Sequence, residues 1–176
     1  MLTKVEIENY RCFPTFRMEG LARVNLLVGK NNSGKTALLE AVQFLASGGD
    51  PLVLDSIARR RSEFVMTRAG KKMIDASHFF HGHKIFRDST IQISSDIGHA
   101  PVLVRVDGIL NLDDFDESAH EDITPDPPAF NLQFEGGLLS PQNRYSYQLT
   151  KEGGVDFFRT KLSAMLALIR NSIFSP

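Results

Sequence analysis

The sequence predicts an α/β domain in which a strand–loop–helix unit is followed by a layer of antiparallel strands. Three observations support this fold class. An apolar run at residues 23–28 enters a glycine-rich loop, an amphipathic helix pattern leaves that loop at residues 35–46, and alternating segments occupy residues 89–150. A strand, a glycine-rich loop and a helix in this order are typical of phosphate-binding domains.

The composition is that of one soluble globular domain. The chain has 176 residues, of which 42% are hydrophobic and 23% charged, and its formal net charge of −1 excludes a protein that coats nucleic acid by bulk charge. The single cysteine, Cys12, excludes a disulfide-stapled secreted domain. No apolar run reaches the ~18 residues of a membrane span, and the N-terminus lacks a signal-peptide pattern. We therefore expect a cytoplasmic protein with no membrane partner.

Residues 1–50 are expected to form the strand–loop–helix core. Residues 3–10 alternate and predict a strand, and residues 13–18 predict a short second strand paired antiparallel with it. Residues 23–28 are apolar on both faces, as in a strand buried in a parallel or mixed sheet. A helix should follow at residues 35–46. Its expected buried face consists of Leu38, Leu39, Val42 and Leu45.

Residues 51–88 are predicted to be a helical insertion. Gly48 and Gly49 can end the preceding helix in the left-handed conformation. Asp50 and Pro51 supply an N-cap and a proline at the first helical position for a second helix that ends at about residue 61. A short helical turn follows around residues 75–81.

Residues 89–150 are predicted to form the antiparallel layer. The alternating segments within it are residues 89–95, 102–107, 129–135 and 144–150. An acidic loop at residues 107–128 interrupts the layer and lacks the ligand spacing of a calcium loop. Residues 157–169 have helical spacing, and we expect residues 155–176 to be a truncated C-terminal helix. The whole of residues 1–176 would then be one N-terminal lobe.

The loop after residue 28 matches the phosphate-binding motif G-x-x-x-x-G-K-[ST] in full. Gly29 turns the chain off the strand, and Gly34 lets the backbone approach phosphate without a Cβ in the way. Lys35 would act as the catalytic residue at the β- and γ-phosphates, and the Thr36 hydroxyl would ligate Mg²⁺. The motif therefore predicts a P-loop NTPase that uses ATP and Mg²⁺. The expected nucleotide-binding residues are Gly29, Lys30, Asn31, Asn32, Ser33, Gly34, Lys35 and Thr36.

Three short segments, residues 7–13, 31–33 and 38–41, resemble the start of the RecF/SMC-type ABC ATPase heads. The similarity is greatest to the overcoming-lysogenization-defect (OLD) family and related ATPases of bacterial defence systems, and it covers residues 1–46. It implies that the chain is the first lobe of an ABC-type head, linked to DNA metabolism or phage defence. In that family a basic residue after the opening strand lies near the nucleotide, which here implies Arg11. The alternative for Arg11 is an ordinary surface arginine at a strand end.

The other motifs of that family have no good counterpart here. Residues 46–50 superficially resemble a signature motif, but they lie where a helix C-cap is expected. Residues 102–107 superficially resemble a Walker B strand, but Arg105 interrupts the apolar run and no acidic residue follows Asp107. The resemblance therefore implies a partner, either the missing C-terminal half of the head or a second copy in a homodimer. Nucleic acid would be contacted through the parent assembly, and the isolated chain should bind ATP but barely hydrolyse it.

Other functions remain open. The chain could be a non-hydrolysing nucleotide-binding module of a split complex. A P-loop kinase or GTPase is disfavoured, because the guanine motif Asn-Lys-x-Asp is absent and residues 89–150 are rich in strands.

Two further clusters have alternative interpretations. His78, His81 and His83 could in principle bind Zn²⁺, but no nearby cysteine completes a ligand set, and a helix-end turn is the alternative. A basic cluster could contact a DNA backbone or form a solvated helix end. Its members are Arg59, Arg60, Arg61, Arg68, Lys71 and Lys72.

Overall fold

The computed structural model describes residues 1–67, 70–97, 100–108, 130–137, 145–150 and 153–157. The described strands form one sheet with the order β2-β1-β5-β6-β7-β8-β9-β4-β3, and all of its pairings are antiparallel. The strands are β1 (Lys4–Tyr10), β2 (Phe13–Glu19), β3 (Phe64–Met66), β4 (Lys72–Asp75), β5 (Thr90–Ser95), β6 (Ala100–Gly108), β7 (Phe130–Gly137), β8 (Tyr145–Leu149) and β9 (Gly154–Val155).

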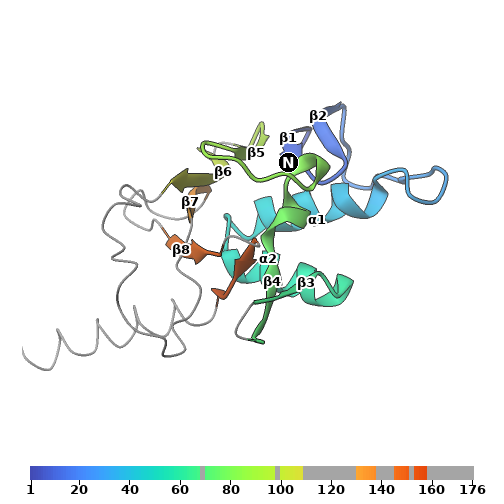
Figure 1. The fold of residues 1–176 in the computed structure, drawn as a ribbon. Helices are drawn as coiled ribbons and strands as arrows, with labels where there is room; N and C mark the ends of the chain where they lie inside the picture. Colours follow the sequence, from blue (N-terminus) through green and yellow to red (C-terminus); the bar gives the residue numbers. More distant parts are fainter. Residues whose placement is uncertain (68–69, 98–99, 109–129, 138–144, 151–152, 158–176) are drawn as a thin grey trace, which may run out of the picture.

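Two α-helices lie between the two ends of this curled sheet (Figure 1). Helix α1 spans Lys35–Ala46, and helix α2 spans Pro51–Arg61. The helix boundaries are those that the capping residues predict. Gly48 and Gly49 have φ angles of 71° and 83° after α1, and the Asp50 carboxylate accepts a hydrogen bond from the Leu52 N–H at 3.0 Å.

The predicted antiparallel strands are confirmed. Strands β5, β6, β7 and β8 are consecutive neighbours, so that this part of the chain is a meander. Two short 3₁₀ segments, η1 (Ala76–Phe79) and η2 (His81–His83), occupy the predicted helical turn. The alternating patterns predicted these strands correctly because one face of each strand packs on the core. In β5, for example, Ile91 and Ile93 are at most 1% exposed. The predicted helix at residues 157–169 and the acidic loop lie outside the described residues, except for their first residues.

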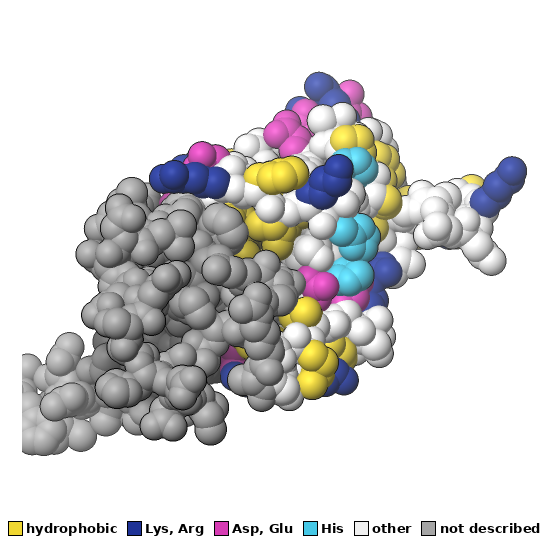
Figure 2. Space-filling view, viewed as in Figure 1, with side chains coloured by type: hydrophobic (Ala, Val, Ile, Leu, Met, Phe, Trp, Pro, Cys, Tyr) yellow, Lys and Arg dark blue, Asp and Glu magenta, His cyan; other side chains and the backbone are white. Residues whose placement is uncertain are grey.

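The predicted buried strand at residues 23–28 is wrong. Val24, Leu26 and Val28 are 88%, 85% and 79% exposed, and they belong to the connection between β2 and α1, part of which projects from the body of the molecule (Figures 1 and 2). A strand needs a neighbour for its backbone groups, and β1 already has β2 on one edge and β5 on the other. The side chain of Asn25 also closes a local turn, accepting from the Ala22 N–H at 2.9 Å.

Helix α1 buries a face slightly different from the predicted one. Its buried residues are Ala37, Leu38, Glu40, Ala41 and Phe44. Leu39 is 59% exposed, whereas Val42 and Leu45 are only partly buried against the core. Both faces of α1 carry apolar residues, so the sequence pattern alone does not predict which face is buried. Packing of the helix against the sheet determines the buried face.

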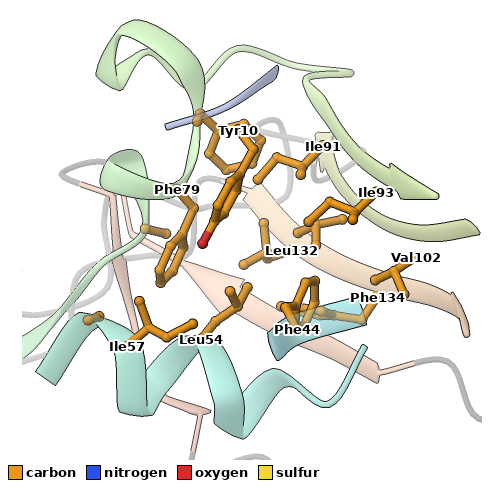
Figure 3. Close-up of a cluster of buried hydrophobic side chains, with 14 of the residues drawn as sticks. Tyr10, Phe44, Leu54, Ile57, Phe79, Ile91, Ile93, Val102, Leu132 and Phe134 are labelled. Atoms are coloured by element: carbon orange, nitrogen blue, oxygen red, sulfur yellow. The ribbon is translucent and has the colours of Figure 1, made fainter. Parts of the chain in front are cut away.

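The core lies between the helices and the concave face of the sheet (Figure 3). Phe44 of α1 packs edge-to-face on Phe134 of β7, with ring centroids 6.4 Å apart. Leu54 and Ile57 of α2 are fully buried in the same cluster. Among the described residues, no helix is long and apolar enough to cross a membrane.

The turn between α1 and α2 packs closely on the sheet, and this contact generates a stability prediction. A Cβ on Gly49 would lie 2.9 Å from Cγ1 of Val102 in β6, and Gly49 has a φ angle of +83°. We expect Gly49→Ala to destabilise the chain by about 2–4 kcal/mol, through backbone strain and overpacking together. The free energy of unfolding from a urea titration measures the effect.

Gly20→Ala is the matched control. Gly20 has a similar φ angle of +72°, but a Cβ there would meet nothing within 4 Å. This variant should lose only the backbone contribution, about 1 kcal/mol. Equal losses in the two variants would contradict a packing role for Gly49.

Candidate functional site

The phosphate-loop motif ends at the first turn of α1. Gly34 is the N-cap of the helix, with a φ angle of +86° and no side-chain cap. A Cβ at Gly34 would lie 2.9 Å from Cζ of Phe13 and 3.0 Å from Sγ of Cys12, because the β1–β2 turn (residues 10–13) packs against it. Glycine is therefore required both by the backbone conformation and by this close approach. The first N–H groups of α1 have no acceptor within the helix, as at any helix N-terminus.

The side chain of Lys35 crosses the loop that precedes it. Its ammonium donates to the carbonyl oxygens of Gly29 and Lys30 at 2.8 and 2.6 Å, and to Oγ of Ser33 at 3.3 Å. The loop is thus closed around the lysine. Thr36 follows with an exposed side chain, for which the described residues offer no hydrogen-bond partner.

A cavity of about 740 Å³ lies at this end of α1. This volume is within the range typical of small-molecule sites. The loop, the β1–β2 turn, the end of α2 and the η1–η2 segment all contribute to its walls. The lining residues are Arg11, Cys12, Asn31, Asn32, Ser33, Gly34, Lys35, Thr36, Ala37, Arg61, Glu63, His78, His81, Gly82 and His83. The structure thus brings most of the predicted nucleotide-binding residues together, including Arg11.

Arg11 is the centre of a buried ion-pair network. Its guanidinium forms a bidentate pair with Glu63, at 2.8 and 3.0 Å, and its Nε lies 3.0 Å from Oε2 of Glu40. The side chains of Arg11, Glu40 and Glu63 are only 8%, 8% and 9% exposed. Arg61 joins the network through Glu40 at 2.8 and 3.1 Å. Arg11 is therefore not an ordinary surface arginine, and its contact with a nucleotide stays a prediction.

Burial affects the ionisation of this network. It disfavours the charged form of Arg11, but hydrogen bonds to Glu63 and Tyr10 outweigh that effect and raise the pKa of Arg11 above its usual range. Burial also raises the pKa of the Tyr10 phenol to about 12. The Tyr10 hydroxyl accepts a hydrogen bond from Nε of Arg11 at 3.3 Å. The arginine stays cationic and the phenol neutral throughout the physiological pH range.

The basic cluster at the end of α2 is largely paired within the chain. Arg59 forms a bidentate pair with Asp55 at 2.7 and 3.1 Å, and Arg60 donates to Oε1 of Gln43 at 3.1 Å. With Arg61 bound to Glu40, each arginine of this run has an acceptor inside the molecule. These pairings favour a helix end stabilised by its own acidic neighbours over a surface that presents unpaired charge to DNA.

Three motif-like segments do not take the role that they resemble. Residues 46–50 form the end of α1 and the N-cap of α2, as expected for a C-cap rather than a signature motif. Residues 102–107 lie inside β6, and no residue of β6 is among the lining residues of the cavity in the described part of the chain. Among the residues that the structure describes, no group of His, Cys, Asp and Glu side chains could hold a metal ion, so the zinc interpretation has no support.

Comparison with known proteins identifies the family. The family model of the AAA ATPase domain matches residues 1–125, which is more than half of the chain. The chain belongs to the AAA ATPase domain family. This family has a P-loop NTPase fold, in agreement with the predicted motif, and no solved structure matches the chain significantly.

Several curated relatives share parts of this ATPase domain. The DNA replication and repair protein RecF of Shewanella woodyi is 29% identical over 135 residues, which cover 77% of this chain and 34% of that protein. RecF of Acinetobacter baumannii is 45% identical over 47 residues, 27% of this chain and 13% of that protein. An ATP/GTP phosphatase of Helicobacter pylori is 38% identical over 45 residues, 26% of this chain and 12% of that protein. The chain thus spans at most about a third of the length of these relatives.

The two carboxylates that pair with Arg11 were not among the residues predicted from the sequence. Glu40 lies on the buried face of α1 between Ala37 and Ala41, and an acidic residue in such an apolar stripe is a signal for a buried cationic partner. Glu63 carries no such signal, because it follows the end of α2 and its partner Arg11 is 52 residues away in the chain.

The network around Arg11 generates a second stability prediction. Arg11→Ala would leave the buried carboxylates of Glu40 and Glu63 without this cation, and we expect a loss of about 3–5 kcal/mol. Arg17→Ala is the control, because Arg17 is 60% exposed and pairs with the exposed Glu19. It should lose less than about 1 kcal/mol. Urea titration of both variants measures the difference, and similar losses would show that the Arg11 network does not stabilise the fold.

Proposed function

We propose that this chain is the ATP-binding lobe of an ABC-type ATPase. The observation that carries the proposal is the cavity at the N-terminus of α1, which is lined by Lys35, Thr36 and the backbone of the preceding loop. A triphosphate is strongly anionic, and backbone N–H groups, a helix N-terminus and a lysine ammonium are the groups that stabilise such charge. Adenine is preferred to guanine in this proposal, because the sequence lacks the motif Asn-Lys-x-Asp.

Lys35 would change its acceptors when the phosphates bind. Its ammonium already lies against the carbonyl oxygens of Gly29 and Lys30 and the hydroxyl of Ser33. A phosphate oxygen with a full negative charge is a stronger acceptor than a neutral carbonyl. The exchange keeps the ammonium inside the loop, so little rearrangement of the side chain is required.

The residues at the start of α1 fit a magnesium ion. Mg²⁺ takes oxygen ligands, mostly water and phosphate, with few protein groups. The Thr36 hydroxyl is an exposed oxygen on the cavity wall, next to the lysine that would hold the phosphates. When bound, Mg²⁺ would neutralise part of the charge on the β- and γ-phosphates.

The described cavity lacks a free carboxylate for hydrolysis. Among the residues that line it, only Glu63 is acidic, and both of its oxygens accept hydrogen bonds from Arg11. A carboxylate engaged in this way is poorly placed to orient an attacking water. The proposed function of the chain alone is therefore nucleotide binding, and turnover would require groups from a partner. The same observation favours the second candidate, a non-hydrolysing nucleotide-binding module.

The exposure of residues 23–28 supports the proposal that a partner chain pairs with this segment as an added strand. Val24, Leu26 and Val28 form an alternating exposed row, while Leu27 packs on the core. An apolar segment with this period and without a neighbouring strand is a template for pairing with another chain segment. We propose that the missing C-terminal half of the ATPase head pairs with residues 23–28. The alternative partner is a second copy of this chain, which would contact the nucleotide in a homodimer.

The proposed role of the parent protein is in DNA metabolism. The relatives named DNA replication and repair protein RecF, which share part of the ATPase domain, support this assignment. A narrower assignment to OLD-like ATPases of phage defence rests on residues 7–13 and on the loop sequence. Nucleic acid would bind to the assembled parent, because the arginines at the end of α2 are paired inside this lobe.

The test of ATP binding uses Lys35→Ala. Loss of the ammonium should weaken ATP binding by about 2–4 kcal/mol, roughly 30- to 700-fold, because its charge-assisted hydrogen bonds to phosphate are lost. Cys12 lines the same cavity, is exposed and is the only cysteine of the chain. Its alkylation by N-ethylmaleimide should therefore be slowed by Mg²⁺ and ATP in the parent chain but not in the variant.

Lys84→Ala provides the control for this experiment. Lys84 carries the same charge, but it is exposed and does not line the cavity. This variant should bind ATP within about threefold of the parent, since an exposed charge away from the site is largely screened. ATP binding to Lys35→Ala as tight as to the parent would refute the assignment of the phosphate site.

A further prediction concerns turnover. We expect the isolated chain to release phosphate from ATP at a rate close to the buffer background, three or more decades below an assembled ATPase, because the groups that orient water and clamp the γ-phosphate are absent from the described cavity. A phosphate-release assay with and without Mg²⁺ measures this rate. Robust turnover that depends on Mg²⁺ and is lost in Asp107→Asn or Glu63→Gln would show that the chain carries its own catalytic carboxylate.

A further inference from the structure

Three histidines form one wall of the cavity at α1. His78 comes from η1, and His81 and His83 come from η2. All three line the same cavity as Lys35 and Thr36. Figure 2 shows them in a row on one face of the molecule. We call these three residues the histidine wall, and the phosphate-loop motif does not account for them.

The backbone of this wall is fixed to the β1–β2 turn. The Arg11 N–H donates to the Phe79 carbonyl at 2.9 Å, and Tyr10 forms a β-bridge with Phe80. The Arg11 guanidinium also donates to the His78 carbonyl at 3.4 Å. Phe79 and Phe80 are fully buried. The histidines on either side of these two anchors are thus held on a fixed base, as a binding wall requires.

His81 has a defined tautomer when it is neutral. Its Nδ1 lies 2.9 Å from the Arg11 carbonyl oxygen, which can only accept, so Nδ1 carries the hydrogen. The Nε2 atom is then an acceptor, and it has no hydrogen-bond partner among the described residues. An acceptor pairs with the O–H or N–H groups of a nucleoside and is repelled by the oxygens of a phosphate.

The other two histidines form an aromatic pair. The rings of His78 and His83 meet edge-to-face with centroids 4.4 Å apart. Nε2 of His78 lies 3.6 Å from Oδ2 of Asp75, a carboxylate that does not itself line the cavity but disfavours further negative charge next to His78. Aromatic rings next to a carboxylate suit a flat, neutral ligand group such as a nucleobase, which stacks on aromatic faces.

We propose that the histidine wall binds the nucleoside part of a nucleotide whose phosphates lie on the loop at residues 29–36. His81 would accept a hydrogen bond from a ribose hydroxyl or an amino group, and the His78–His83 pair would contact the base. The inference rests on the proposed ATP binding and adds the residues that recognise the part of the ligand beyond the phosphates. The cavity of about 740 Å³ reaches from the loop to this wall.

The test compares two ligands that share the phosphate chain. Affinities of Mg²⁺–ATP and Mg²⁺–tripolyphosphate are measured by calorimetry for the parent chain and for His81→Ala and His83→Ala. Each variant should bind ATP about 5- to 50-fold more weakly, the range expected for loss of a stacking or hydrogen-bonding contact, and tripolyphosphate within about twofold of the parent. Lys84→Ala is the control, because Lys84 is exposed, follows η2 directly and does not line the cavity. It should change neither affinity.

The possible outcomes separate this inference from the phosphate site. Unchanged ATP affinity in both histidine variants, with thermal unfolding like that of the parent, would overturn the histidine wall and leave the phosphate loop intact. Equal weakening of ATP and tripolyphosphate would also overturn it, because the wall would then act on the phosphates. If the parent binds neither ligand, or if Lys35→Ala binds both as tightly as the parent, the phosphate site itself is refuted.

Discussion

The buried guanidinium of Arg11 joins four segments that are far apart in the sequence. It belongs to the β1–β2 turn, and it binds Glu40 on α1, Glu63 after α2 and the His78 carbonyl in η1. Carboxylates with so little exposure are strongly unfavourable without a cation, because burial removes their hydration. The relative positions of the helices, the turn and the histidine segment therefore depend on this one side chain, and so does the shape of the cavity between them.

The turn that carries Arg11 has an unusual backbone. Asn9 and Arg11 have φ angles of +55° and +51°, a left-handed conformation that is unfavourable for residues other than glycine. The surrounding structure compensates for it, since the Arg11 N–H donates to Phe79 and the Asn9 side-chain amide donates to the Thr90 carbonyl at 3.1 Å. Strained turns held by hydrogen bonds are common at binding sites. This turn contacts Gly34 through Phe13 and Cys12, and it thereby links the ion-pair network to the phosphate loop.

Much of this architecture could be predicted from local sequence patterns. The two helices and the meander were predictable because capping residues and alternation act over a few neighbouring positions. Strands β3, β4 and β9 were not, because they have at most four residues each and little alternation to detect. The segment at residues 23–28 has the composition of a buried strand, but whether it pairs depends on a neighbour that its own residues do not determine.

In the candidate site, too, local motifs were predictable from the sequence and contacts between distant segments were not. The loop motif predicted Lys35 and Thr36 as binding residues, because phosphate binding requires fixed residues at a fixed spacing, and both residues line the cavity. The pairing of Arg11 with Glu40 and Glu63 was not predictable, since it joins segments that only the folded chain brings together. Nor did the sequence show that the three histidines face the loop across one cavity.

The distribution of charge allows one small region to support the fold and, in the proposed function, to bind an anion. Arg11 and Arg61 are cations beside the cavity, but Glu40 and Glu63 offset most of their charge. In the proposed function, Lys35 and the N-terminus of α1, which lie within one short segment, would supply most of the attraction for a triphosphate. The same pairing occupies the described acidic residue that lines the cavity, Glu63, so it cannot readily serve in catalysis. One ion-pair network thus stabilises the fold and also occupies the acidic residue of the described cavity, which in the proposed function leaves hydrolysis to groups from a partner.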